Sequence, residues 1–276
     1  MRRQPLAEVW PRPAVVGVLN VTPDSFTDGG NNHDPRDAVE TALRLFAEGA
    51  ALVDIGGEST RPGARPVSLD EELRRVMPVL EELPGMALSV DTSKAEVARR
   101  ALELGVALVN DVSALRLDPD MAGVIADSGA YVCLLHMQGD PRTMQLEPRY
   151  GDVVADVAAF LEERLAAAVA AGISEDRVCI DPGIGFGKTV PQNLALLNGL
   201  DRFCAIGPPV LVGVSRKSTL ARVLGDPGGR VGSDAASIGA AVAAFDRGAT
   251  LFRVHDVAAH VEALAIAAAV EHGAEC

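Results

Sequence analysis

The sequence predicts an α/β protein of the (β/α)8 barrel class, in which eight parallel strands alternate with helices. Short apolar runs of five to seven residues recur eight times, and helix-capping signals follow them. Near-continuous Val, Leu and Ile runs are typical of parallel strands buried on both faces. The units average about 32 residues, which fits a strand–helix repeat. Because no linker or shift in composition divides the chain, we expect one domain over residues 1–276. An open doubly wound sheet is the alternative.

The predicted strands are the apolar runs themselves. In chain order they are Val15–Asn20, Ala51–Gly56, Ala87–Asp91, Ala107–Asp111, Ala130–His136, Arg177–Asp181, Val210–Ser215 and Leu251–His255.

Helix punctuation fills the stretches between these runs. Cap residues before a proline, capping boxes and single glycines mark where helices begin and end. The predicted starts are Asp34-Pro35, Ser68-x-x-Glu71, Ser93-x-x-Glu96, Asp118-Pro119 and Asp152, and the predicted ends are Gly49, Gly105, Gly129, Gly172 and Gly273. We interpret segment 225–235 as a loop within the seventh unit.

The charge balance argues against a polyanionic partner. The chain has 25 Lys and Arg against 38 Asp and Glu, a net charge of −13. This charge disfavours binding to nucleic acid or to an anionic membrane, although a local basic pocket for a small anion stays possible. The longest apolar helix candidate, Val257–Val270, contains His260 and Glu262. We therefore expect no membrane-spanning segment.

The cysteines indicate a reducing compartment. Cys133, Cys179, Cys204 and Cys276 form no Cys-x-x-Cys pair and have no matching histidine spacing, so a structural zinc site is not predicted. Free thiols are typical of cytoplasmic proteins. The first apolar run is short and ends at Asn20, so we expect no signal peptide and a cytoplasmic location.

Polar side chains stand at the carboxyl end of every predicted strand. In such barrels the active site is built on the loops at that end. One polar strand end is ordinary capping, but eight that converge on one mouth indicate a binding site. These residues are Asn20, Glu58 and Thr60, Asp91, Asn110 and Asp111, His136, Asp181, Ser215 and Lys217, and Arg253 and His255.

One side of the predicted mouth has the chemistry of a phosphate site. Strand eight closes the barrel against strand one, so Arg253 and His255 are expected beside Asn20. Thr60 and Arg61 lie one strand further round. Guanidinium, imidazole, amide and hydroxyl groups hold phosphate oxygens and a magnesium ion. The alternative is that Arg253 and His255 form a surface pair.

The other side combines acceptors with a cation. Asp91, Asn110 and Asp181 offer oxygens to the paired N–H groups of an amino-pyrimidine edge; the alternative is that each carboxylate merely caps a strand end. Lys217 is predicted at the head of a helix, where a cation opposes the macrodipole, and this placement favours a ligand role. His136 is compatible with ordinary packing.

A glycine-rich segment resembles a phosphate-binding loop without meeting its pattern. In the segment 181–189, Pro182 stands where that pattern requires glycine, and the glycine spacing also fails. A nucleotide loop is therefore not predicted. We expect a turn that lets a flat ligand approach the backbone.

Several motifs along the chain resemble one family. They are Val18–Phe26 with Asp28–Gly30, Asp54–Gly63, Ser89–Thr92, Val109–Asp111, His136–Gly139 with Pro141, Asp181–Phe186, Val214–Lys217 and Arg253–Asp256. In this order they resemble the bacterial dihydropteroate synthases, over essentially the whole chain. The departures are Thr27, Asn31-Asn32-His33 and Gly232-Ser-Asp-Ala235; none removes a matched functional position.

The resemblance implies a reaction, a metal and residue roles. (7,8-dihydropterin-6-yl)methyl diphosphate would condense with 4-aminobenzoate to give 7,8-dihydropteroate and diphosphate in folate synthesis, by an SN1-like step assisted by Mg²⁺. A homodimer and sulfonamide binding are implied as well. The implied roles are Asn20 for the magnesium ion; Thr60, Arg253 and His255 for diphosphate; Asp91, Asn110, Asp181 and Lys217 for the pterin; Ser215, Arg61 and Pro62 for aminobenzoate; and Phe186 for substrate binding. Asn20, Asp91, Lys217 and Arg253 are the implied catalytic residues.

Two alternatives to this reaction stay open. A methyltetrahydrofolate:corrinoid methyltransferase has a similar pterin barrel but no use for a diphosphate group at Arg253 and His255. The second alternative is a pterin-binding module without catalysis. We also expect the loops Thr22–Asn32 and Ser59–Ser68 to be mobile and to close over the reacting centre, with Phe26 and Pro62 available to cover an aromatic ring.

Overall fold

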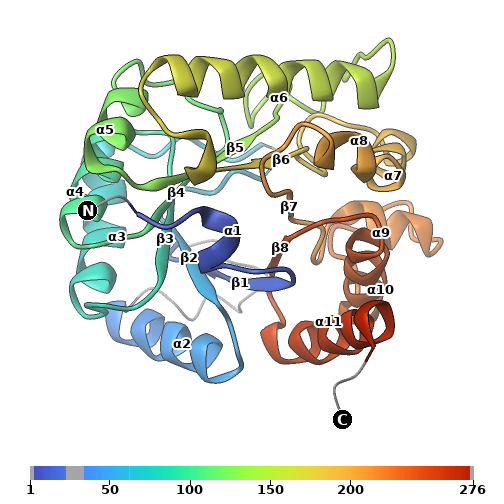
Figure 1. The fold of residues 1–276 in the computed structure, drawn as a ribbon, viewed down its shortest axis with the longest axis horizontal. Helices are drawn as coiled ribbons and strands as arrows, with labels where there is room; N and C mark the ends of the chain where they lie inside the picture. The colour runs from blue at the N-terminus through green and yellow to red at the C-terminus, as the bar shows by residue number, and fades with distance from the viewer. Residues whose placement is uncertain (1–2, 23–33, 62, 274–276) are drawn as a thin grey trace.

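The strands form one sheet of eight parallel strands in the order β6-β5-β4-β3-β2-β1-β8-β7 (Figure 1). The computed structural model describes residues 3–22, 34–61 and 63–273. The strands are β1 Ala14–Asn20, β2 Leu52–Gly56, β3 Leu88–Asp91, β4 Leu108–Asp111, β5 Tyr131–Leu135, β6 Val178–Asp181, β7 Leu211–Val212 and β8 Leu251–Val254.

The two edges of this sheet meet. Ile180 of β6 forms a parallel bridge with Val210, which precedes β7, and the Ile180 N–H donates to the carbonyl of Pro209 at 3.0 Å. The sheet is therefore a (β/α)8 barrel, as predicted, and the open sheet is excluded. This closure between β6 and β7 consists of fewer pairs than the ladders elsewhere among the described strands.

Helices surround the strands (Figure 1). They are α1 Leu6–Val9, α2 Pro35–Ala47, α3 Leu69–Glu81, α4 Ala95–Glu103, α5 Met121–Ser128, α6 Val153–Ala170, α7 Val190–Asn198, α8 Leu200–Cys204, α9 Ser218–Val223, α10 Asp234–Phe245 and α11 Val257–His272, with a 3₁₀ turn η1 at Glu175–Arg177. Within the described ranges, none of them is long and apolar enough to cross a membrane.

Three of the predicted helix starts are confirmed. Asp34 caps α2, Ser68 caps α3 and Asp152 caps α6, each with a side-chain oxygen that accepts a backbone N–H. At α3 the Glu71 carboxylate pairs with Arg74 and Arg75 and does not close the predicted capping box.

Two predicted starts are wrong in detail. The N-cap of α4 is Lys94 rather than Ser93, and it makes no side-chain cap. Asp118 accepts the Ala95 N–H at 2.8 Å, so it serves α4, while α5 begins after Asp120. The first N–H groups of a helix have no partner within the helix, and at α4 the Asp118 carboxylate accepts one of them in place of a side-chain cap from the N-cap residue.

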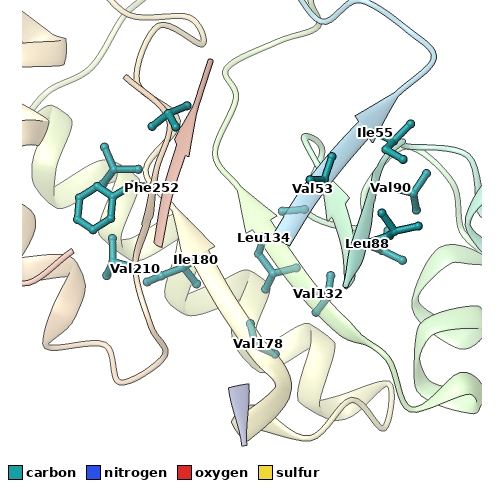
Figure 2. Packing of buried hydrophobic residues seen from close by; sticks show 14 of the residues in the cluster. Val53, Ile55, Leu88, Val90, Val132, Leu134, Val178, Ile180, Val210 and Phe252 are labelled. Atoms are coloured by element: carbon teal, nitrogen blue, oxygen red, sulfur yellow. The ribbon is translucent and has the colours of Figure 1, made fainter. Parts of the chain in front are cut away.

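Alternation along the strands divides the core into two parts. Outward residues such as Val53, Val90 and Ile180 pack against the surrounding helices, and Figure 2 shows part of this layer. Inward residues near the strand starts form a second apolar cluster with Leu6 and Trp10, which cover that end of the barrel. Its other buried members are Ala14, Val16, Leu52, Leu108, Tyr131, Cys133, Cys179, Leu211 and Leu251. Asp54, Asp91, Asn110 and Arg253 lie at inward positions beyond this cluster.

Candidate active site

Four inward side chains form the polar floor of the site, which we define as Asp54, Asp91, Asn110 and Arg253. Asp54 Oδ2 accepts from Arg253 Nε at 2.6 Å and from Asn110 Nδ2 at 3.1 Å. Asp91 Oδ2 accepts from a terminal nitrogen of Arg253 at 2.9 Å. The side chain of Asp54 is 1% exposed, whereas that of Arg253 is 20% exposed. The guanidinium therefore faces the mouth from a buried acidic base.

Three acceptors of the polar floor have no partner among the described residues. They are Oδ1 of Asp54, Oδ1 of Asp91 and Oδ1 of Asn110, all of them buried. A buried oxygen without a donor is costly, and such atoms are normally satisfied by protein, water or ligand. The floor is thus suited to a ligand that presents several N–H groups.

Burial decides the protonation of the carboxylates here. It raises the pKa of Asp91 to about 7, against the lowering effect of Arg253 and with a further upward effect of the Asp54 charge. It likewise raises the pKa of Asp181 to about 6, although the Gly183 N–H donates to Asp181 Oδ1 at 2.7 Å. Burial also disfavours a charged Arg253, but Asp54 and Asp91 outweigh it and raise the arginine pKa.

Lys217 faces the same mouth from the other side. It immediately precedes α9, as predicted, and its Nζ lies 4.2 Å from the ring centroid of Phe186. Burial lowers the pKa of Lys217 to about 8; the Arg253 charge acts in the same direction and the Asp181 charge opposes it. The structure therefore brings together Asp181 and Lys217, which the resemblance assigns to the pterin, and Phe186, which it assigns to substrate binding.

Ser215 and His255 connect the ends of β7 and β8. Ser215 Oγ lies 3.1 Å from His255 Nδ1 and also accepts the backbone N–H of His255 at 3.2 Å. Burial lowers the pKa of His255 to about 3, and the Arg253 charge adds to this effect. The imidazole is therefore neutral near pH 7 and acts as a hydrogen-bonding group rather than as a cation.

Asn20 lies further toward the mouth than the sequence suggested. β1 and β8 are neighbours, as predicted, but the register pairs Arg253 with Val16. The expectation that Arg253 stands beside Asn20 is therefore wrong, because Asn20 comes four residues after Val16 on the strand. Asn20 is instead level with Gly56 of β2.

The loop after β2 contributes two of the predicted residues. Thr60 and Arg61 are partly exposed, and the charge of Arg61 contributes to the lowered pKa of Lys217 and His255, so its guanidinium lies near them. Pro62 and residues 23–33, which include Phe26 and Thr27, lie outside the described residues. The predicted closure of the two loops stays a prediction.

His136 belongs to packing, as the sequence allowed. Its ring lies edge-on to Phe160 at 4.7 Å, and burial together with the charge of Lys188 lowers its pKa to about 2. It is therefore not available as a proton carrier near neutral pH.

Sequence reasoning missed Asp54 and Lys188. The sequence analysis assigns no role to Asp54, because this residue lies inside its strand rather than at the carboxyl end. A signal was present, since Asp54 follows the inward Leu52 by two residues in a run that is otherwise apolar. An inward charge at that position must meet a partner or a ligand. The buried Lys188 had no such signal.

No group of three or more His, Cys, Asp or Glu side chains that could hold a metal occurs in the described part of the chain. Asn20, to which the resemblance assigns the magnesium ion, has an amide oxygen, a hard donor of the kind that Mg²⁺ takes. Mg²⁺ keeps several waters and takes phosphate oxygens, so a single protein ligand fits it, whereas a structural zinc site needs more.

The chain matches known proteins along most of its length. The family model described as pterin binding enzyme matches residues 16–255. This chain belongs to the pterin-binding enzymes. Dihydropteroate synthase of Escherichia coli K12 is 45% identical over 258 residues, which cover 92% of this chain and 90% of the relative. The chain is accordingly a transferase of the dihydropteroate synthase family, which joins a pterin group to an amine.

Solved structures of this family are similar in fold. Dihydropteroate synthase of Yersinia pestis, in a complex with a sulfonamide drug, superposes with a TM-score of 0.89 at 44% identity, covering 94% of each chain. The Xanthomonas albilineans synthase with 4-aminobenzoic acid gives 0.87 at 50% identity, covering 96% of this chain and 95% of the other. The same protein with 7,8-dihydropteroate gives 0.82 at 43% identity over the same shares.

Proposed function

We propose that this pterin-binding enzyme condenses (7,8-dihydropterin-6-yl)methyl diphosphate with 4-aminobenzoate to give 7,8-dihydropteroate and diphosphate. The observation that carries the proposal is the polar floor, in which three buried oxygens lack donors beneath a partly exposed guanidinium. One ring with several N–H groups and one attached anion satisfy both features. The ligands of the Xanthomonas albilineans structures support this substrate class.

The pterin would lie between the polar floor and Lys217. Its amino-pyrimidine edge offers N–H donors to Asp181 and to the open oxygens of Asp91 and Asn110. Each such bond would replace a costly unsatisfied acceptor, so a close analogue without the N–H groups would bind poorly. Phe186 and Lys217 would border the ring on the side of β6 and β7.

The diphosphate would bind toward the mouth. A guanidinium has five N–H donors, and Arg253 uses two of them on Asp54 and Asp91, which leaves three for phosphate oxygens. Arg61 and Thr60 lie on the adjoining loop, and neutral His255 can donate from Nε2. The Asp54 contact fixes the guanidinium in orientation before substrate arrives.

Asn20 would hold the magnesium ion through its amide oxygen. When bound, Mg²⁺ supplies charge neutralisation at the diphosphate. With Asn20 as the single proposed protein ligand, the affinity for the ion is expected to depend on the presence of diphosphate.

The residues of the site stabilise charge rather than attack the substrate. The C–O bond between the pterin methylene and the diphosphate breaks, and Arg253 takes up the charge that develops on the leaving oxygen. The amine nitrogen of aminobenzoate then bonds to the cation-like methylene carbon and loses a proton. Ser215 and Arg61 would hold the aminobenzoate in line for this step.

The experiment that tests the proposal measures diphosphate release with each component omitted in turn. Release is expected only when the pterin diphosphate, 4-aminobenzoate and Mg²⁺ are all present. Methyl transfer from methyltetrahydrofolate to a corrinoid without diphosphate would contradict the proposal, and so would pterin binding without turnover. Asp91→Asn should reduce the rate, whereas Asp201→Asn, an exposed aspartate on α8, is the matched control.

Location and assembly belong to the same proposal. The described cysteines, Cys133, Cys179 and Cys204, are free thiols, which supports a reducing cytoplasm. A homodimer is inferred from the resemblance and is tested by sedimentation of the purified chain.

A further inference from the structure

Lys188 is a buried lysine next to the site that the proposed chemistry does not use. Its residue is 3% exposed. The Nζ atom lies 2.9 Å from the carbonyl oxygen of Gly183, 3.0 Å from that of Phe186 and 3.2 Å from that of His136, and 2.9 Å from His136 Nδ1. One amine therefore joins two points of the turn after β6 to the end of β5.

These contacts explain the segment that resembles a phosphate-binding loop. Its lysine points into the protein rather than toward a mouth, and its threonine begins the next helix, because Thr189 and Gln192 form a capping box at the start of α7. The Gly-Lys-Thr sequence thus closes the turn from within and then starts α7.

The turn 182–187 contacts two residues of the pterin group. The Gly183 N–H donates to Asp181 Oδ1 at 2.7 Å, and the Phe186 ring lies under the Lys217 ammonium at 4.2 Å. A Cβ added to Gly185 would meet Lys217 Cδ at 3.2 Å. The position of the turn therefore sets the orientation of Asp181 and the place of Lys217.

The turn has little freedom on the side of β5. Gly183 has a φ of +70°, and a Cβ there would lie 1.9 Å from the carbonyl oxygen of His136. The two backbones are in direct contact at this point. Lys188 lies behind this contact and binds carbonyls from both sides.

We propose that Lys188 is a positioning residue, which fixes the turn 182–187 against the end of β5 and thereby aligns Asp181, Phe186 and Lys217 for the pterin. The inference rests on the proposed function, which supplies the pterin. Without Lys188, the carbonyls of Gly183 and Phe186 lose a donor in a buried place, and the turn separates from His136.

The contacts that fix the turn do not depend on the charge of Lys188. As an ammonium, Lys188 donates to both carbonyls of the turn and to His136 Nδ1; as a neutral amine, it donates to the two carbonyls and accepts from an Nδ1–H of His136. Burial lowers the pKa of Lys188 to about 7, with Asp181 opposing and Lys217 adding to this effect, so both forms occur near neutral pH. Each form therefore binds both carbonyls of the turn and the ring of His136.

The test is Lys188→Met in the full chain, with two readouts. Amide hydrogen exchange of residues 182–187 should become at least tenfold faster, while exchange in β3 and β4 stays as in the unchanged protein. The dissociation constant for the pterin diphosphate, measured by calorimetry, should rise at least tenfold, while the KM for 4-aminobenzoate changes by less than a factor of about two to three.

Two further variants keep the test decisive. Phe203→Leu removes core volume on α8, which supplies none of the contacts of Lys188 described above, and should lower stability without changing either readout. If Lys188→Met does not fold, His136→Phe replaces it, because this variant removes the Nδ1 contact but keeps a ring against Phe160. It should speed exchange and weaken pterin binding, each by less than Lys188→Met.

The outcomes separate the two proposals. If the unchanged protein does not bind the pterin diphosphate, the proposed function fails. The exchange measurement then still shows whether Lys188 fixes the turn 182–187. If exchange of 182–187 is unchanged in Lys188→Met, or if Phe203→Leu weakens pterin binding equally, the positioning role is wrong.

Discussion

Asp54 accepts a hydrogen bond from Arg253 Nε at 2.6 Å, and this pair connects β2 to β8 across the strand that separates them. The contact lies in the barrel interior, where the side chain of Asp54 is almost fully buried. It holds the guanidinium in one orientation, and Asp91 fixes its other end. The remaining N–H groups of Arg253 are thereby directed before any ligand arrives, which reduces the ordering cost of binding.

Replacing Asp54 should change the protonation of Asp91. Asp54→Asn keeps the shape of the side chain and an acceptor for Asn110. It removes the negative charge of Asp54, which raises the pKa of Asp91. Arg253 then has Asp91 as its remaining partner in the floor. The pKa of Asp91, about 7 in the unchanged protein, should fall. Carbon chemical shifts of the labelled carboxyl measured against pH check this; an unchanged or higher pKa would contradict it.

Asp181 should make the folded state less stable as pH rises. Its native pKa of about 6 lies above the value of about 3.9 in unfolded chains, so the folded state binds the proton more tightly. The stability that this proton contributes is complete below about pH 4 and is lost as pH rises through about 6, in total on the order of 2–3 kcal/mol. Asp181→Asn should lack this dependence.

Urea unfolding from pH 4 to pH 7 measures the effect. The free energy of unfolding of the unchanged protein minus that of Asp181→Asn should decrease over this range. Asp201→Asn is the control and should follow the unchanged protein. A difference that stays constant or grows with pH would overturn the assignment.

His255 should not titrate between pH 5 and pH 8. Its pKa is lowered to about 3 by burial, with the charges of Arg253 and Arg216 adding to the effect, whereas an imidazole in an unfolded peptide titrates near 6.5. Nitrogen and proton shifts of the His255 ring should therefore stay constant over that range. A titration near pH 6.5 would mean that the ring is a cation available to the diphosphate, contrary to the neutral role assigned here.

Lys94 should be needed for stability because it pairs with two glutamates. Its Nζ contacts Glu58 of the loop after β2 and Glu72 of α3, and Glu72 is fully buried. Lys94→Met leaves a buried carboxylate without its cation, a change that typically costs about 3–5 kcal/mol. Urea unfolding should show a loss of this order, and Glu72→Gln in the same chain should restore part of it.

The matched control lies on the same helix. Arg99→Met removes exposed ion pairs with Glu96 and Glu103 on α4, and it should change the free energy of unfolding little. Equal losses of stability in Lys94→Met and Arg99→Met would show that the buried ion pairs of Lys94 contribute no more than the exposed pairs of Arg99.

The fold was predictable because its signals are local. Each strand was predicted within one or two residues of its bounds except β7, which spans Leu211–Val212, with a single bridge at Val210 before it, instead of Val210–Ser215. The ladder stops there because the backbone turns toward Arg216, whose φ is +56° and whose guanidinium binds Asp234 of α10. The start of α7 after Thr189 is not among the predicted helix starts, because its capping box lies inside the segment that resembles a phosphate-binding loop.

The site was predictable where strand ends carry it. Asp91, Asp181, Ser215 and Lys217 follow from polar strand ends and barrel topology. The partners of those residues did not follow, because contacts such as Asp54 with Arg253 or Lys188 with His136 join segments far apart in the chain. The register between β1 and β8, which moved Asn20 away from Arg253, also depends on packing rather than on a local pattern.

The short closure between β6 and β7 makes this junction the seam at which the barrel can open most easily. The seam separates Asp181 at the end of β6 from Ser215 and Lys217 after β7. A ligand that contacts residues on both sides would hold the two strands together. Ligand binding to the closed form alone stabilises the fold by mass action. Occupied barrels should therefore resist local opening along β6 and β7 more than empty ones, so that substrate supply in the cell would also govern how long each molecule survives proteolysis.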